Sequence, residues 1–187
     1  MKKNIFAAIA LVLSAAAAAS AALPAGDNVF AALRDEMGRS MSRLDMDGLG
    51  KPYFLAYRVD DGHYFGLVAS FGALERTVSY DYRRLTVDLR MGSPKFDNSG
   101  YAPNPWDDYG TVADWNLPLD DNYDALRFSV WSATDKAYKE ALENLSKKKA
   151  FVEARNMTEL YADMTPQPAF ELYRPASAER MDEAAWT

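Results

Sequence analysis

The sequence contains no cysteine and only one histidine, His63, among its 187 residues. Disulfide bonds and thiolate metal sites are therefore excluded within this chain. A zinc site of the HExxH type needs two histidines, and a Cys-His catalytic pair needs a cysteine, so both are excluded as well. The chain also lacks the phosphate-binding patterns GxGxxG and GxxxxGK[ST]. Carboxylates, hydroxyls and aromatic side chains remain as the groups available for chemistry.

The remaining candidates for chemistry are few. A Ser-His-Asp triad would have to use His63, and no nucleophile elbow of the GxSxG type accompanies it. His63 follows a predicted turn, a position that favours a solvent-facing or hydrogen-bonded structural histidine. Acidic residues in the second half of the chain offer oxygen ligands for a hard cation, but such residues are more typical of soluble loops and helix caps. They are Asp107, Asp108, Asp114, Asp120, Asp121 and Asp124. We predict no catalytic, cofactor-binding or metal-binding residue.

Long hydrophobic runs are confined to the N-terminus. Lys2 and Lys3 precede an apolar run at residues 5–13, and residues 19–21 (ASA) fit a signal-peptidase site. The apolar run is short for a membrane span, which favours a cleaved secretory signal at residues 1–22 over a retained anchor. We therefore expect export, to a bacterial periplasm. Loss of the two lysines takes the net charge from −6 to −8, which disfavours nucleic acid or an anionic membrane as a partner.

Hydrophobic periodicity predicts an α+β fold with an antiparallel sheet of three or more strands packed against two helices. Apolar residues at steps of three and four predict a first helix, capped by Asp27 and running to about Asp45. Alternation then predicts a hairpin at 53–71 with its turn at 60–62 (DDG). A third strand is expected within 75–91, bent or bulged near residues 80–84. This alternation indicates an antiparallel sheet with one solvent-exposed face.

The longer helix is predicted at about 121–149. Asp120 and Asp121 stand where an N-cap belongs, and residues 147–149 (KKK) close the C-terminal end, so both ends suit the helix dipole. Acidic and basic residues four apart add exposed ion pairs, namely Asp135 with Lys139 and Glu143 with Lys147. The apolar stripe comprises Tyr123, Leu126, Val130, Ala133, Ala137, Ala141 and Leu145.

Regular structure is not predicted between the strands and this helix. Residues 92–118 hold four prolines and three glycines. A loop this long in a compact domain is usually functional or fixed by its own side chains. Its aromatic residues could hold a ligand or fix the loop, and the pattern favours fixing the loop for all five: Phe96, Tyr101, Trp106, Tyr109 and Trp115. The residues singled out as a ligand or interface site are Tyr101, Trp106, Tyr109 and Trp115.

Four segments resemble the beginning of exported TldD/PmbA-type proteins, the metallopeptidase-related relatives of the modulator of DNA gyrase family. In chain order they are KPYFLAYRV, LVASFGAL, LTVDLRMGSPKFDN and LPLDDNYDALRFSVWSATDKAYKEALENLSKKKA. The resemblance runs from about Val29 to Arg174 and keeps the order of the segments. Its most specific part is LPLDDNYDALR, followed by ATDKAYKEAL and KKKA.

The resemblance implies a zinc peptidase whose ligands, an HExxxH motif and a further residue, lie beyond the matched region. No position of this sequence receives those ligands, because His63 lies in the early hairpin without an HE partner. The resemblance thus implies no cofactor in this chain, and zinc only in the full-length family. We expect residues 23–174 to form a catalytically silent amino-terminal domain with a structural or substrate-lining role. Residues 175–187 are then the tail of a truncated or split gene product, or of a stand-alone domain.

A half-domain of this kind would leave one face of its sheet uncovered, and a large exposed apolar patch usually marks an interface. We therefore expect a homo-oligomer, or a second chain that carries the rest of the peptidase. The alternative is an exported binding or scaffold protein that uses the loop 92–118 for a peptide or sugar. A hydrolase that uses carboxylates alone has no positive support, because nothing singles out a pair of acids.

Overall fold

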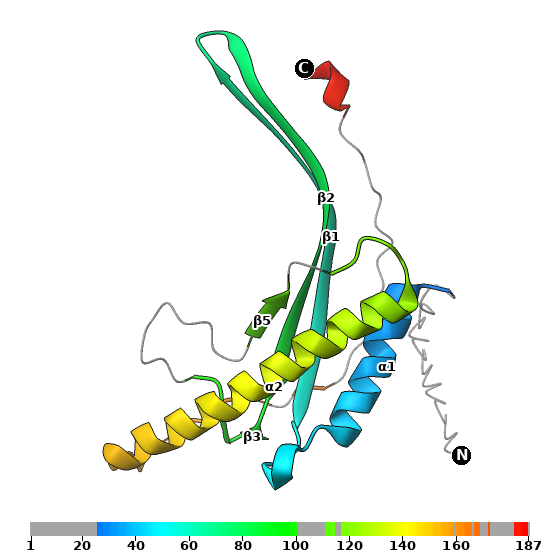
Figure 1. Cartoon of the computed structure of the whole chain (residues 1–187). Helices are drawn as coiled ribbons and strands as arrows, with labels where there is room; N and C mark the ends of the chain where they lie inside the picture. The colour runs from blue at the N-terminus through cyan, green and yellow to red at the C-terminus, as the bar shows by residue number, and fades with distance from the viewer. Residues whose placement is uncertain are drawn as a thin grey trace, which may run out of the picture.

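The structure is a computed structural model that describes residues 26–100, 111–114, 117–158, 160–165, 167–168, 172 and 182–186. Within them the chain forms two long helices, an antiparallel main sheet and a small second sheet, which confirms the α+β class (Figure 1). The predicted signal peptide at 1–22 and most of the predicted tail at 175–187 lie outside the described residues. No helix in the described parts of the chain is long and apolar enough to cross a membrane.

Two long strands make up most of the main sheet. Strand β1 (Phe54–Ser70) pairs antiparallel with β2 (Ala73–Arg90) over its whole length. The third strand, β5 (Thr111–Asp114), has four residues and pairs only with residues 85–88 of β2. The prediction of three or more strands is therefore slightly overstated, because the sheet is in essence a two-stranded ribbon.

The turn predicted at residues 60–62 is wrong, because β1 continues through it. Asp60 and Asp61 lie opposite Arg84 and Arg83 of β2 and form ion pairs with them at 3.0 and 2.6 Å. Gly62 lies opposite Tyr82, and a Cβ atom on this glycine would be 2.8 Å from the tyrosine hydroxyl oxygen. The DDG sequence thus serves cross-strand packing, and the predicted strands at 53–71 are one strand.

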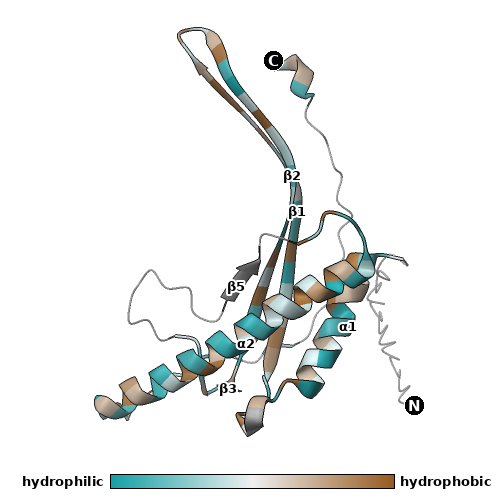
Figure 2. Cartoon of the chain, viewed as in Figure 1, coloured by the Kyte–Doolittle hydropathy of each residue, from teal (hydrophilic) through white to brown (hydrophobic). Residues whose placement is uncertain are grey.

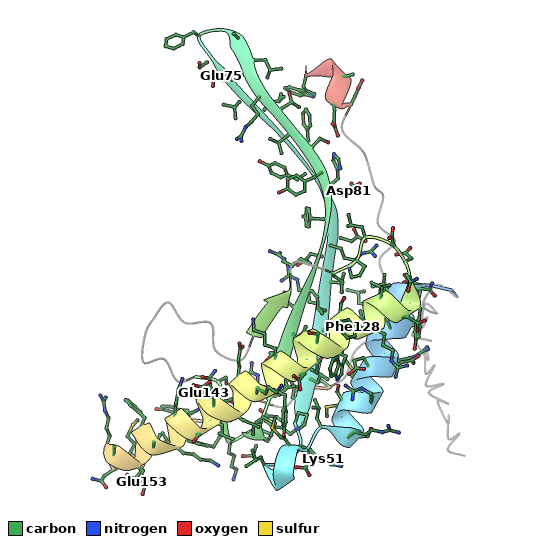
Figure 3. The ribbon with its side chains drawn as sticks, viewed as in Figure 1. Lys51, Glu75, Asp81, Phe128, Glu143 and Glu153 are labelled. Atoms are coloured by element: carbon green, nitrogen blue, oxygen red, sulfur yellow. The ribbon has the colours of Figure 1, made fainter. Side chains whose placement is uncertain are left out.

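The true hairpin turn is at Phe71 and Gly72, whose φ angles of 52° and 81° match a type I′ turn. The register of the two strands shifts between Val68 and Ala69, near this turn. No register shift occurs at residues 80–84, where a bend or bulge is predicted, but the ribbon does bend near Asp81 (Figure 3). That segment stays in register with β1 because its arginines face the two aspartates.

Both helices are confirmed, with corrections to the second. Helix α1 (Asn28–Arg43) is capped as predicted by Asp27, whose carboxylate accepts hydrogen bonds from the amides of Val29 and Phe30. Helix α2 (Tyr123–Ala154) is capped by Asn122 instead of Asp120 or Asp121. It also continues past residue 149, so the three lysines lie inside the helix and do not close it.

The two predicted ion pairs on α2 are confirmed. The Lys139 ammonium lies 2.6 Å from the Asp135 carboxylate, and the Lys147 ammonium lies 2.7 Å from that of Glu143. Each pair is exposed and contributes only a few tenths of a kcal/mol.

Both helices pack on one face of the inner half of the ribbon (Figure 1). Two tyrosines connect the layers: Tyr57 of β1 shares a hydrogen bond of 2.6 Å with Thr134, and Tyr138 donates to the Gly50 carbonyl at 2.7 Å. Burial raises the pKa of Tyr57 to about 12, so this hydroxyl keeps its proton. The buried apolar residues of the two long strands and α2 include Leu55, Leu85, Val87, Leu89, Leu126, Val130, Ala133, Ala137 and Ala141.

The segment 92–118 is not entirely irregular, contrary to expectation. Strand β3 (Gly92–Ser93) pairs with β4 (Phe96–Asp97) in a second, two-stranded sheet, and β5 also falls in this segment. Gly92 has a φ of 100°, and a Cβ atom at this position would lie 2.5 Å from the Phe96 carbonyl oxygen. The tight turn onto the sheet therefore requires glycine.

We predict that Gly92→Ala lowers the free energy of unfolding by about 2–4 kcal/mol, through backbone strain and the clash with Phe96. Gly38→Ala is the matched control, since Gly38 lies in α1 with nothing within 4 Å of the added Cβ atom. This control should stabilise the fold by about 0.5–1 kcal/mol. Urea denaturation followed by circular dichroism measures both values, and equal effects of the two substitutions would contradict the packing described at Gly92.

Candidate functional site

The four residues predicted as a ligand or interface site, Tyr101, Trp106, Tyr109 and Trp115, lie outside the residues that the structure describes. Phe96, from the same loop, is partly buried against the hydrophobic core. Its ring centroid lies 4.8 Å from the Lys148 ammonium nitrogen. This one aromatic residue fixes the loop to the fold, as the sequence predicts.

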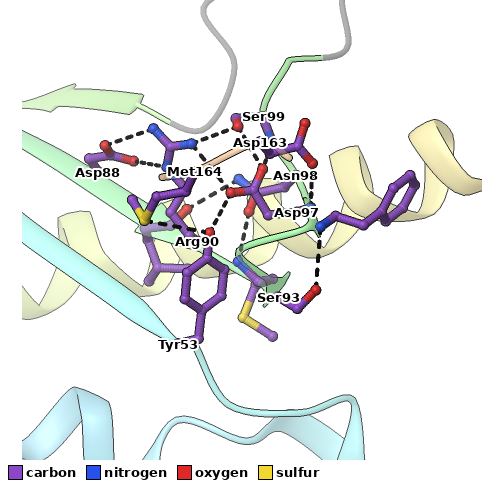
Figure 4. Close-up of polar contacts among 12 residues, drawn as sticks. Tyr53, Asp88, Arg90, Ser93, Asp97, Asn98, Ser99, Asp163 and Met164 are labelled. Atoms are coloured by element: carbon purple, nitrogen blue, oxygen red, sulfur yellow. Dashed lines mark hydrogen bonds and ion pairs between the residues drawn. The ribbon is translucent and has the colours of Figure 1, made fainter. Parts of the chain in front are cut away.

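A buried polar network fixes the same segment to the end of β2 (Figure 4). Asp97 and Asn98 are fully buried. The Asn98 amide accepts a hydrogen bond from the Met91 backbone amide at 2.7 Å and donates to the Leu89 carbonyl at 3.1 Å. It thereby takes the place of a neighbouring strand at this edge of the sheet.

Asp97 is the acceptor at the centre of the network. Its carboxylate accepts hydrogen bonds from the Tyr53 hydroxyl at 2.5 Å, from the Ser99 amide at 2.7 Å and from the Arg90 guanidinium at 3.3 Å. Burial acts to raise the pKa of Asp97, but the bonds from Ser99 and Tyr53 outweigh it and hold the pKa below its usual range. Burial, together with Asp97, raises the pKa of Tyr53 well above its ordinary value. In this pair Tyr53 therefore stays the donor and Asp97 stays the acceptor, which suits a structural role.

Lys148 connects this network to α2 and to the segment after it. Its ammonium donates to the Ser99 carbonyl and to the Asp163 carboxylate, both at 2.6 Å. Asp163 also accepts from the Asp97 backbone amide at 2.7 Å. All buried side-chain nitrogen and oxygen atoms among the described residues have hydrogen-bond partners. Sequence reasoning missed this network, because its members are far apart in the chain and the lysine run is equally typical of a helix end.

A second charged cluster marks the place where the helices stop covering the ribbon. The Arg83 side chain is only 9% exposed and donates to Asp61 at 2.6 Å, to Asp121 at 3.0 Å and to the Pro118 carbonyl at 3.0 Å. It borders a cavity of about 560 Å³ beside the start of α1. Asp121, which the sequence predicts as a helix cap, is instead a partner of this arginine.

The acidic residues weighed as cation ligands do not form a site in the described part of the chain. Asp107 and Asp108 lie outside it, and Asp121 is engaged with Arg83. In residues 26–100, 111–114 and the described parts of 117–186, no group of three or more His, Cys, Asp or Glu is placed to hold a metal ion.

The part of the hairpin beyond Arg83, residues 62–82, is named here the distal ribbon. It projects beyond α1 and α2, and its side chains between Glu75 and Asp81 stand clear of both helices (Figures 1 and 3). It is nevertheless partly apolar (Figure 2). The exposed large hydrophobic residues of the distal ribbon are Tyr64, Leu67, Val68, Phe71, Leu74, Tyr80 and Tyr82.

Three tyrosines share the face of the distal ribbon that points away from the helices, named here the tyrosine face. The rings of Tyr64 and Tyr80 are cross-strand neighbours with centroids 5.1 Å apart, and both residues are about half exposed. Tyr64 covers Gly66, where a Cβ atom would be 2.8 Å from the tyrosine hydroxyl, and Tyr82 covers Gly62 in the same way. The missing side chains of these two glycines leave room for the tyrosine rings on this face.

His63 lies on the opposite face of the distal ribbon, named here the helix-side face, which continues the face that packs on α1 and α2. Its Nδ1 atom is 2.8 Å from the Asp81 carboxylate and its Nε2 atom is 3.2 Å from the Ser79 hydroxyl. These spacings are those of a Ser-His-Asp triad. However, the Glu183 carboxylate is closer to Nε2, at 2.6 Å, and also accepts from Ser79 at 3.3 Å.

The occupied Nε2 atom rules out a general base in this arrangement. Each imidazole nitrogen faces a carboxylate oxygen, and an ionised carboxylate only accepts hydrogen bonds, so both nitrogens carry protons. The bonds to Asp81 and then to Glu183 raise the pKa of His63, which agrees with a protonated ring. His63 is thus hydrogen-bonded, as the sequence favours, although its partner Glu183 has no sequence signal.

Comparison with known proteins adds no relative: no family model matches the chain, and no curated protein or solved structure is significantly similar to it.

We predict that Lys148→Met destabilises the fold by about 3–5 kcal/mol, because it leaves the largely buried Asp163 carboxylate without its cation. Lys147→Met is the matched control, since this neighbouring side chain is 53% exposed and pairs on the surface with Glu143. The control should change stability by less than about 1 kcal/mol. Chemical denaturation at neutral pH compares the two, and a mild effect of Lys148→Met would show that the buried network contributes little.

Proposed function

We propose that the chain is an exported, catalytically silent amino-terminal module of a TldD/PmbA-like zinc metallopeptidase, with a structural, substrate-lining or assembly role in proteolysis. The proposal rests on the resemblance of four sequence segments and on where those segments lie in the fold. It places the zinc chemistry in another part of the protein or in a second chain.

The observation that carries the proposal is that side chains of the segments with the resemblance take part in the framework contacts of the fold. Asp97 and Asn98 come from the KFDN segment, and Lys148 from the KKKA segment, and all three belong to one buried network. The LPLDD segment supplies Asp121 and the Pro118 carbonyl to Arg83. Residues whose hydrogen-bonding groups are occupied in this way hold the fold together. This structural role supports a structural module over an independent enzyme.

The distal ribbon supports an assembly role for this module. A two-stranded hairpin with no third layer is marginal in water, and this one exposes apolar side chains on both faces. Cover from a second copy, or from a second chain that carries the rest of the peptidase, would bury them. The tyrosines suit such a contact, since aromatic residues are enriched in protein interfaces.

Phe71 at the tip gives a further reason for an interface. It is fully exposed and has a φ of 52°, the left-handed conformation that glycine and asparagine adopt most readily in a type I′ turn. A bulky residue there costs about 1–2 kcal/mol of folded-state stability. Contact between its ring and a partner accounts for a residue that is unfavourable in the isolated chain.

We expect Phe71→Asn to stabilise the isolated chain by about 0.5–1 kcal/mol and to weaken its self-association or its pairing with a second chain. Light scattering over a range of concentrations measures assembly, and urea denaturation measures stability. Tyr161→Ser is the control, because this tyrosine is 98% exposed outside the ribbon. A wild-type chain that stays monomeric at every concentration, alone and with candidate second chains, would contradict the assembly role.

The DNA that follows codon 187, together with the adjacent reading frames, tests the proposed identity directly. We expect a coding sequence with an HExxxH motif, and we expect the purified chain alone to bind no stoichiometric zinc. Tight binding of one zinc ion per chain would overturn the proposal, as would the lack of any such coding sequence in the genome.

A further inference from the structure

The described part of the C-terminus contacts the distal ribbon. The short helix η2 (Glu183–Ala185) lies beside the hairpin, with the helix-side face toward it (Figure 1). The contact joins residues that are 120 positions apart in the chain. It therefore brings a segment from outside the predicted domain onto a surface that α1 and α2 leave uncovered.

The contact is built around one carboxylate. A single oxygen of Glu183 accepts hydrogen bonds from His63 Nε2 at 2.6 Å and from the Ser79 hydroxyl at 3.3 Å. The two donors come from neighbouring strands, because His63 lies on β1 and Ser79 on β2. Asp81, directly opposite His63 in the ladder, holds Nδ1 at 2.8 Å and so fixes the orientation of the ring.

We propose that His63 and Ser79 form a carboxylate-binding site on the helix-side face of the distal ribbon, and that the C-terminal segment occupies it through Glu183 as a detachable strap. The inference does not depend on the proposed function, since it concerns only this contact. The ligand class is a carboxylate on an acidic peptide segment, and the chain's own tail is its occupant in the structure.

The chemistry of the site favours a carboxylate over a neutral ligand. The imidazolium supplies a charge and an N–H group, and the hydroxyl supplies a second donor toward the same oxygen. Hydrogen bonds between charged partners are about twice as strong as neutral ones. Both partners are partly exposed, with 35% of the His63 side chain and 37% of the Glu183 side chain accessible, so water competes and the contact can open.

The strength with which the site binds the strap depends on pH through the protonation of His63. Among the described residues, the charged groups on its face are Asp81 opposite it, Asp61 and Arg83 as the next pair toward the body, and Glu183 from the strap. The pKa of His63 is raised in the folded chain, first by Asp81 and then by Glu183. The contribution of the imidazolium is therefore complete below its ordinary pKa of about 6.5 and is lost as the pH rises through the higher folded-state value. The strap is therefore held more tightly at pH values below the folded-state pKa of His63 than above it.

Nuclear magnetic resonance tests the site directly, because His63 is the sole histidine and its imidazole signals need no assignment. The full chain is titrated between about pH 5 and about pH 9. We expect Glu183→Gln to lower the pKa of His63, and Glu143→Gln, a control on α2, to leave it unchanged. A pKa that does not respond to Glu183→Gln would overturn the proposal.

A label on the strap measures its release. The chain has no cysteine, so a thiol-reactive dye added to the Ala185→Cys variant attaches at this position alone. Its fluorescence anisotropy should fall as the pH rises, and should already be low at neutral pH in the Glu183→Gln and Ser79→Ala backgrounds. Anisotropy that is the same in all backgrounds and at every pH would show that the strap does not bind there.

Adding the C-terminal segment as a separate peptide tests whether the site recognises it without the covalent connection. A synthetic peptide of residues 179–187 should bind the Glu183→Gln chain, whose own strap is released, and shift the His63 signals. The same peptide with Gln in place of Glu183 should bind at least severalfold more weakly. Equal binding of both peptides would show that the carboxylate is not what the site recognises.

Discussion

The structure depends on a mismatch of length between its strands and its helices. A strand of 17 residues spans about 56 Å, whereas the 16 residues of α1 span about 24 Å, and α2 crosses the ribbon at an angle instead of following it (Figure 1). The helices therefore cover only the inner half of the hairpin. Buried leucines and valines occur in this half alone, while the distal ribbon keeps apolar side chains that no helix covers. The proposed assembly surface and the strap site both follow from this uncovered length.

Ion pairs of two largely buried cations, Arg83 and Lys148, close the covered half at its two ends. Arg83 marks the outer limit through two aspartates, and Lys148 with Asp163 marks the inner limit beside the turn at Gly92. Breaking either pair leaves a charge in a poorly hydrated place, so these contacts specify which loops lie on the sheet more than they add net stability. Of these charged residues, Asp121 and Lys148 lie in the segments that resemble a peptidase family.

Local signals in the sequence predicted local structure well and distant pairing poorly. Asp27 and the stripe of α1 predict that helix because capping and periodicity act within a few residues. The DDG sequence predicts a turn for an equally local reason, but Arg83 and Arg84, more than 20 positions away, keep those aspartates in a strand. Lys148 and the contact of Glu183 with His63 were missed because nothing near them in the chain indicates a partner. The predicted aromatic site in the loop 92–118 stays a prediction, since its four residues lie outside the described part of the chain.

The central claim is that the distal ribbon is an interface, and amide hydrogen exchange tests it most directly. Peptides that cover residues 62–82 should exchange quickly in the dilute chain, because a two-stranded ribbon without a third layer opens easily. Exchange in these peptides should slow markedly as the concentration rises or a second chain is added, while peptides of the covered core stay unchanged. Slow exchange of the ribbon in dilute monomer, unaffected by concentration or partner, would show that it is stable alone and would contradict the account.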